Sequence, residues 1–185
     1  ALTSPFFYLY STMVYDTIYA ISHFKGAMPM KAVCIAGWSD SGKTTLIERL
    51  IPLLMGRGLR VGVVKHTHHS LSMDQHGSDT DRYRGSGAAA VVLAAPDGTA
   101  LLDSCPMNLA QTLALMPDMD LILVEGFDRE AHLPTLEVWR TQDAPFRSRE
   151  EWRCAVITDL PCETKLPVFS PSDIDAIADF IGTLL

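Results

Sequence analysis

A chain of 185 residues is long enough for one domain with a substantial core, and 48% apolar with 20% charged residues is typical of a globular protein. Its formal net charge of −7 argues against a general nucleic-acid binder, because such proteins need excess positive charge to neutralise phosphates. The four cysteines form no C-x-x-C pair, so we expect a reduced, cytoplasmic protein rather than a disulfide framework.

The first 29 residues differ from the rest of the chain. They are rich in aromatic residues and lack a basic leader, and Asp16 interrupts their apolar run. We therefore expect neither a signal peptide nor a membrane span. Regular strand and helix patterns begin at Met30. We predict a domain over residues 30–185 and an extension over residues 1–29, which reflects a misplaced start codon or forms an apolar arm that packs on a partner.

The first predicted strand covers residues 32–36. The stretch that begins directly after it, at Gly37, has the G-x-x-x-x-G-K-T pattern of a P-loop. Apolar residues at helical spacing come directly after it, so the strand, loop and helix context that the motif requires is present. A glycine-rich turn that matches the pattern by chance is the alternative. The predicted nucleotide-binding residues are Gly37, Trp38, Ser39, Asp40, Ser41, Gly42, Lys43, Thr44 and Thr45.

The residue types of this loop suit a nucleoside triphosphate with Mg²⁺. Gly37 and Gly42 let the backbone turn tightly and approach phosphate oxygens, while the loop N–H groups and the following helix N-terminus attract anions. Lys43 can reach the β- and γ-phosphates, and the Thr44 hydroxyl can hold Mg²⁺. We therefore predict that Lys43 is a catalytic residue and that Thr44 is a metal ligand.

Strands and helices alternate along the rest of the chain, with one hairpin among them. A glycine near residue 58 ends the first helix, Ser78 or Asp79 caps a short helix, and residues 172–175 resemble a capping box. The turn Pro96-Asp97-Gly98 indicates the hairpin. Predicted strands cover residues 60–65, 88–94, 99–102, 120–126, 133–139, 154–158 and 167–169, and predicted helices cover 80–86, 107–116 and a closing segment from 174.

This alternation predicts an α/β fold. The uninterrupted apolar run before Glu125 suits a parallel strand that is buried on both faces. Together with the P-loop, the pattern predicts a P-loop NTPase fold of three layers, with a mainly parallel sheet and a β-hairpin extension.

Glu125 ends the most apolar predicted strand. In P-loop proteins a carboxylate at such a position contacts Mg²⁺ or the attacking water, so we predict a catalytic and metal-binding role for Glu125. The alternative is a solvated carboxylate at a strand end.

The polar segment after strand 60–65 is a candidate switch or substrate loop, and we assign to it Lys65, His66, Thr67 and His68. Zinc binding by its histidines and a solvated polar loop are the alternatives. Asp79 and Arg84 lie in the next predicted helix, where an arginine either clamps an anionic ligand or contributes only surface charge.

Asp159 follows another predicted strand and is a candidate guanine-binding residue. A carboxylate can accept hydrogen bonds from the N1 and N2 groups of guanine, whereas adenine offers no such pair of donors. The chain has no N-K-x-D motif, and a turn-forming aspartate before Leu160-Pro161 explains the residue equally well.

Taken together, these motifs resemble the molybdopterin-guanine dinucleotide biosynthesis protein B family. The resemblance covers residues 30–185 and rests on the P-loop, on K-H-T-H-H at 65–69, on residues 77–88 and on L-V-E-G-F at 123–127. It implies a GTP-binding protein, commonly dimeric, with weak GTPase activity and Mg²⁺ as cofactor. Asp128 and Ser78 stand where the family usually has lysine, so any anion contacts made by those lysines are lost.

The resemblance also implies partners. Members assist the transferase that joins GMP to molybdopterin, so we expect contacts with the molybdenum cofactor guanylyltransferase and other maturation proteins, with molybdopterin as a candidate ligand and a homodimer as the assembly. Nucleic acid and membranes are not expected. The competing functions are a small-molecule P-loop kinase, for which Arg147-Ser148-Arg149 is the candidate lid, and a metallochaperone GTPase that uses the histidines.

Overall fold

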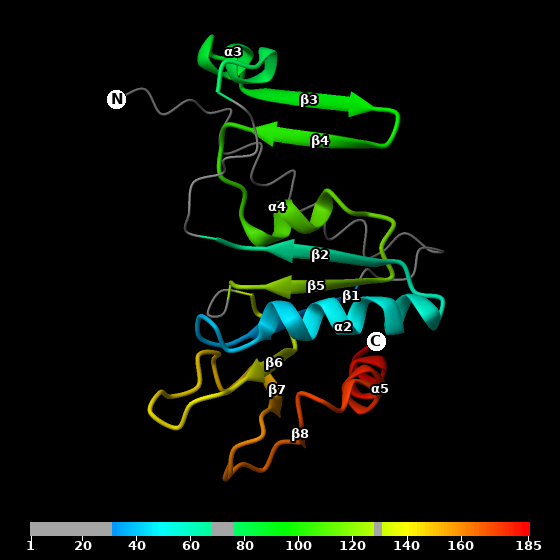
Figure 1. The fold of residues 1–185 in the computed structure, drawn as a ribbon, viewed down its shortest axis with the longest axis vertical. Coiled ribbons are helices and arrows are strands. Elements are labelled where there is room, and N and C mark those ends of the chain that lie inside the picture. The colour runs from blue at the N-terminus through cyan, green and yellow to red at the C-terminus, as the bar shows by residue number, and fades with distance from the viewer. Residues whose placement is uncertain (1–30, 68–75, 128–130) are drawn as a thin grey trace. The chain divides into compact units, whose positions relative to one another are not determined.

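The computed structural model describes residues 31–67, 76–127 and 131–185 (Figure 1). The chain divides into two compact units. Among the described residues, one unit consists of 31–66, 109–127 and 131–185, and the other of 67 and 76–108. Each unit is described by itself.

The first unit contains a six-stranded sheet in the order β2-β5-β1-β6-β7-β8. Every neighbouring pair in this sheet is parallel, which confirms the predicted mainly parallel sheet. Because parallel strands all end at the same edge, this edge collects the residues that follow each strand. The strands are β1 (Lys31–Ala36), β2 (Val61–Lys65), β5 (Leu121–Glu125), β6 (Thr135–Val138), β7 (Arg153–Ile157) and β8 (Val168–Phe169).

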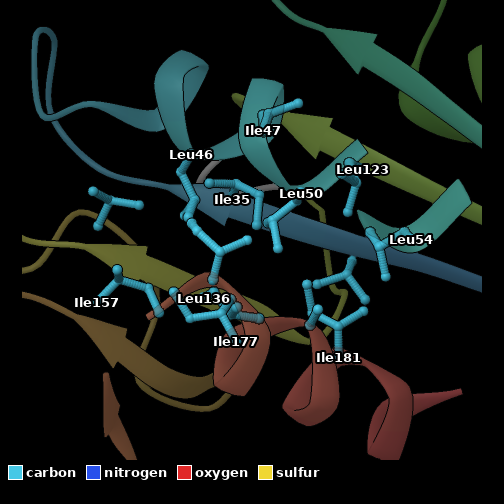
Figure 2. Close-up of a cluster of buried hydrophobic side chains, with 14 of the residues drawn as sticks. Ile35, Leu46, Ile47, Leu50, Leu54, Leu123, Leu136, Ile157, Ile177 and Ile181 are labelled. Carbon is cyan, nitrogen blue, oxygen red and sulfur yellow. The ribbon is translucent and has the colours of Figure 1, made fainter. Parts of the chain in front are cut away.

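Helices α2 (Lys43–Gly56) and α5 (Ile174–Leu184) cover one face of this sheet. Figure 2 shows Leu50 of α2 and Ile181 of α5 directed into the space between the helices and the strands. Burial of such side chains is the main favourable contribution to folding, about 1.5–3 kcal/mol for each fully buried side chain.

Alternate residues of the central strands face the opposite side, as a period of two requires. There Ile122 and Val124 pack with Leu113 of α4 (Leu109–Ala114) in a second apolar cluster. Helices therefore cover both faces of the sheet, which confirms the predicted three layers. Helix α4 is shorter than the predicted span 107–116. In the ranges that the structure describes, no helix is long and apolar enough to cross a membrane.

The ends of the two large helices show where the sequence pattern is informative. Helix α2 continues through Pro52 and ends as predicted at a glycine: Gly58 has φ of 85° and donates to Met55 O, while Leu59 N donates to Leu54 O. Helix α5 begins at Ile174 as predicted, but the capping residue predicted by the capping-box pattern, Ser172, is wrong.

Helix α5 is instead capped by Asp173, whose side chain accepts a hydrogen bond from Ala176 N at 3.3 Å. Ser172 cannot serve because its hydroxyl pairs with that of Ser170 at 2.7 Å, and its carbonyl accepts from Arg49.

The second unit contains α3 (Asp79–Gly85) and an antiparallel hairpin of β3 (Ala90–Ala95) and β4 (Gly98–Asp103). The hairpin confirms the predicted extension, although β3 begins two residues later than expected. Ser78 rather than Asp79 caps α3, since its hydroxyl accepts from Asp81 N at 3.2 Å.

All four cysteines are free thiols, in agreement with the expected absence of a disulfide framework. Cys34 is buried in β1, and burial raises the pKa of the Cys154 thiol in β7. Cys34 therefore packs as a small core side chain, and the raised pKa disfavours the thiolate of Cys154.

Candidate nucleotide-binding site

The glycine-rich loop lies between β1 and α2, as the motif predicts. Gly37 has φ of 145°, and a Cβ there would collide with the Val138 carbonyl oxygen and lie 2.8 Å from Ser41 Oγ. Asp40 and Gly42 also have positive φ, of 60° and 94°. This backbone is closely packed against β6, so only glycine fits at position 37.

The loop and the helix behind it offer unsatisfied polar groups to an anion. Gly42 is the N-cap of α2 and supplies no side-chain cap, so the first N–H groups of the helix lack an intrahelical acceptor. The Ser41 hydroxyl is buried and has no hydrogen-bond partner within the described part of the chain. A phosphate at this helix N-terminus would satisfy these groups.

The side chain of Lys43 folds back into the loop. Its ammonium group donates to Gly37 O at 2.9 Å and to Trp38 O at 2.7 Å. A polyphosphate would be a stronger, charge-assisted partner for the ammonium than these carbonyls. Among the other loop residues, Trp38, Ser39 and Asp40 are exposed.

Thr44 and Glu125 meet at the carboxyl edge of the sheet. The Thr44 hydroxyl lies 3.2 Å from Glu125 Oε1 and 3.3 Å from Oε2. Glu125 is 9% exposed, and the Lys65 ammonium lies 3.3 Å from its Oε1. The pairing of β2 with β5 places Lys65 directly opposite Glu125.

A hydroxyl beside a carboxylate is a suitable pair of hard oxygen ligands for Mg²⁺, which commonly takes one or two protein ligands together with phosphate oxygens and water. Within the described ranges, no three histidine, cysteine, aspartate or glutamate residues form a metal-binding group. The site therefore fits a nucleotide-bound Mg²⁺ better than a metal held by protein alone.

A cavity of about 290 Å³ extends from the loop to the end of β7. Its lining includes Ser41, Thr45, Arg49, Arg140 and Asp159. The Asp159 carboxylate accepts a hydrogen bond from Ser170 Oγ at 2.7 Å, which orients it. Thus the structure brings Asp159 and the P-loop to one cavity, where the size and polarity suit part of a nucleotide.

The candidate switch loop is only partly described. His66 N donates to Glu125 O at 2.8 Å, and the His66 ring stacks on Phe127 with centroids 4.2 Å apart. Gly126 has φ of 91°, and a Cβ on it would lie 2.9 Å from His66 Cβ, so the glycine of the E-G-F motif permits this contact. Thr67 begins the second unit. His68, like Asp128, lies outside the described residues.

Asp79 and Arg84 belong to α3 in the second unit. There Asp79 Oδ1 pairs with Arg82 Nη1 at 3.2 Å. Their role in a switch or substrate loop stays a prediction.

Sequence reasoning missed Glu137, which lies on β6 and is fully buried. Its Oε1 accepts from Arg147 N at 2.7 Å and its Oε2 from Ser148 N at 2.8 Å. It thereby holds the segment 144–149 beside the P-loop, where Trp38 Nε1 donates to Pro145 O at 2.8 Å. The available signal was a glutamate inside an otherwise apolar strand.

Comparisons with known proteins agree with this fold and loop. Residues 32–159 match the model of the family Molybdopterin guanine dinucleotide synthesis protein B. A relative from Haemophilus influenzae, named molybdopterin-guanine dinucleotide biosynthesis adapter protein, is 38% identical over 82% of this chain and 87% of its own. A relative of the same name from Escherichia coli is 35% identical, over 84% of this chain and 94% of its own.

Solved structures give the same result. A crystal structure of molybdopterin-guanine biosynthesis protein B is similar with a TM-score of 0.66 and 30% identity, covering 83% of this chain and 99% of that one. The crystal structure of Bacillus subtilis MobB also has a TM-score of 0.66, with 25% identity over 84% of this chain and 98% of that one.

Proposed function

Because the chain belongs to the molybdopterin guanine dinucleotide synthesis protein B family, we propose that it is a GTP-binding accessory protein of molybdenum cofactor biosynthesis. In this role it assists the guanylyltransferase that attaches GMP to molybdopterin. The name adapter, which its relatives carry, is consistent with a protein that acts on another enzyme.

The observation that carries the proposal is the arrangement of Lys43, Thr44 and Glu125 around the loop. Lys43 exchanges its two carbonyl partners for the β- and γ-phosphates, and the loop N–H groups bind the same phosphate chain. Thr44 and Glu125 hold Mg²⁺ directly or through its water. The metal neutralises charge on the phosphates when it is bound.

The preference for GTP follows from Asp159. Its carboxylate is held by Ser170 at the far end of the cavity that begins at the loop. Guanine presents two adjacent N–H donors to a carboxylate there, and adenine does not. A charge-assisted pair of this kind favours guanine, since the wrong base leaves the carboxylate without its donors.

We infer that hydrolysis is slow and secondary to the accessory role. Glu125 is placed to orient water or metal, and Lys43 to stabilise charge on the transferred phosphoryl group. Near that group the described part of the site offers one well-buried carboxylate, Glu125, whose oxygens already contact Thr44 and Lys65.

The hairpin of the second unit supports a homodimer. Val92, Leu93 and Leu101 are 61%, 54% and 41% exposed on β3 and β4. A two-stranded hairpin with exposed apolar side chains is marginal in water, and a second copy can cover it. Sedimentation of the protein should therefore give a dimer, and Val92→Lys, on the face that Val92 shares with Leu101, should give a monomer.

Capture of partners from cell extract tests the accessory role. The tagged protein should retain the guanylyltransferase, and more of it when GTP and Mg²⁺ are added. Lys43→Ala should lose the nucleotide-dependent part, because only the P-loop is altered. Absence of the guanylyltransferase under both conditions would refute the proposal, and phosphoryl transfer from GTP to a metabolite would favour a kinase instead.

A further inference from the structure

The segment of residues 144–149 is held in place from three sides. The Glu137 carboxylate accepts hydrogen bonds from the backbone N–H groups of Arg147 and Ser148. Arg153 donates to Ser148 Oγ at 3.0 Å and to Ser148 O at 2.6 Å. Trp139 Nε1 donates to Ala144 O at 2.9 Å. A segment with this many hydrogen-bonded backbone groups is ordered rather than mobile.

This segment, residues 144–149, contacts the P-loop at Trp38. Trp38 Nε1 donates to Pro145 O at 2.8 Å, and the Arg147 guanidinium lies 4.9 Å from the centre of the Trp38 ring. The carbonyl of the same tryptophan accepts from the Lys43 ammonium at 2.7 Å. Two cations, Lys43 and Arg147, therefore contact opposite parts of the second residue of the P-loop.

The buried carboxylate of Glu137 needs an explanation. Burying a charged group is unfavourable, and Glu137 is fully buried and accepts hydrogen bonds from the backbone N–H groups of Arg147 and Ser148. An apolar residue would serve β6 equally well as a core side chain. What the carboxylate adds is a fixed position for the backbone of Arg147.

We propose that Arg147 is a second phosphate-binding cation of the nucleotide site and that Glu137 is the positioning residue that holds it there. This inference rests on the proposed nucleotide binding at the P-loop. Arg147 rests on the Trp38 ring and turns about its long side chain towards the phosphates at the loop, where its planar fork binds two phosphate oxygens together. Trp38 is 37% exposed and forms the surface along which the guanidinium moves.

The test is titration of the full-length protein with GTP, GDP and GMP by calorimetry in the presence of Mg²⁺, comparing Arg147→Gln with Arg149→Gln. Arg149 is a matched control because it lies two residues away, is half exposed and pairs with Glu151 at 3.5 Å. We expect Arg147→Gln to weaken GTP binding by about tenfold, GDP binding by less and GMP binding least, since loss of a charge-assisted bond is felt most by the longest phosphate chain. Arg149→Gln should bind as the wild type does.

Glu137→Gln tests the positioning role through a double-mutant cycle with Arg147→Gln. If Glu137 acts through Arg147, the double variant should bind GTP no more weakly than Arg147→Gln alone. Additive losses would overturn the positioning role. If Glu137→Gln does not fold, the comparison of Arg147→Gln with Arg149→Gln still decides the main claim.

Two results would overturn the inference. One is an Arg147→Gln affinity equal to that of the control, and the other is an equal loss for GTP, GDP and GMP, which would mean that Arg147 only supports the loop through Trp38. Either result is compatible with nucleotide binding at the P-loop and so does not contradict the proposed function. Failure of the wild type to bind GTP would instead refute the proposed function.

Discussion

The hydroxyl of Thr44 lies within hydrogen-bonding distance of both carboxylate oxygens of Glu125, although 81 residues separate them in the chain. The contact follows from the order of the sheet. Strand β5 pairs with β1 so that Ile35 lies opposite Glu125, and Thr44 stands in the first turn of the helix that follows β1. Adjacent parallel strands therefore bring the two proposed oxygen ligands together.

Glu125→Gln should slow GTP hydrolysis by about tenfold or more at nearly unchanged GTP affinity. The phosphates remain bound by the loop and Lys43, while the lost charge acts mainly in the transition state. Single-turnover hydrolysis with Mg²⁺, measured beside a binding titration, separates the two effects. Glu48→Gln is the matched control, because Glu48 is an exposed glutamate on α2. Equal hydrolysis rates for Glu125→Gln and wild type would show that Glu125 has no role in GTP hydrolysis.

Much of this site can be predicted from the sequence because its parts are local. The P-loop is a contiguous pattern, and Glu125 is marked by the apolar run that it ends. By contrast, strand pairing carries no local signal, so the contact between Thr44 and Glu125 had to come from the structure. The hydrogen bonds that Glu137 accepts from the backbone N–H groups of Arg147 and Ser148 also have no signal in the sequence, since any residue except proline supplies a backbone N–H.

The start of α5 shows a similar limit. Ser172 and Asp173 are both good caps by residue type, and the choice depends on neighbours distant in sequence. Arg49 donates to the carbonyls of Pro171 and Ser172, at 2.9 and 3.2 Å. These contacts hold Ser172 outside the helix and leave Asp173 as the cap.

Leu50→Ala should destabilise the protein by about 2–5 kcal/mol, because the side chain is fully buried between α2, α5 and the sheet and its loss leaves a cavity (Figure 2). Met55→Ala on the same helix is the control. Met55 is 58% exposed, so its truncation should change the free energy of unfolding by no more than about 0.5 kcal/mol. Urea denaturation measures both, and equal effects would contradict the described core.

Gly126→Ala should lower the free energy of unfolding by about 1–3 kcal/mol. The added Cβ would lie 2.9 Å from His66 Cβ at a φ of 91°, which an L-residue rarely adopts. Gly182→Ala is the opposite case, because a Cβ there meets nothing within 4 Å inside α5. It should stabilise the protein by about 0.5–1 kcal/mol. A neutral Gly126→Ala would show that the contact with His66 relaxes without cost.

We propose that residues 30–185 form the nucleotide-binding domain and that residues 1–29 are an extension. Removal of residues 1–29 should leave GTP affinity within about twofold of the full chain, because the P-loop, Glu125 and Asp159 all follow strand β1 at Lys31–Ala36. Calorimetry on the shortened protein measures this. Loss of solubility or of GTP binding in the shortened protein would show that residues 1–29 are part of the fold.

Comparison of GTP with ATP in one binding titration tests the central claim most directly. In the presence of Mg²⁺, the wild type should bind GTP at least about tenfold more tightly than ATP, which corresponds to one well-placed carboxylate reading guanine. Lys43→Ala should bind neither tightly, because the ammonium between Gly37 O and Trp38 O is lost, whereas Lys165→Ala, at an exposed lysine, should behave as wild type. Equal affinity for GTP and ATP, or GTP affinity unchanged in Lys43→Ala, would contradict the account.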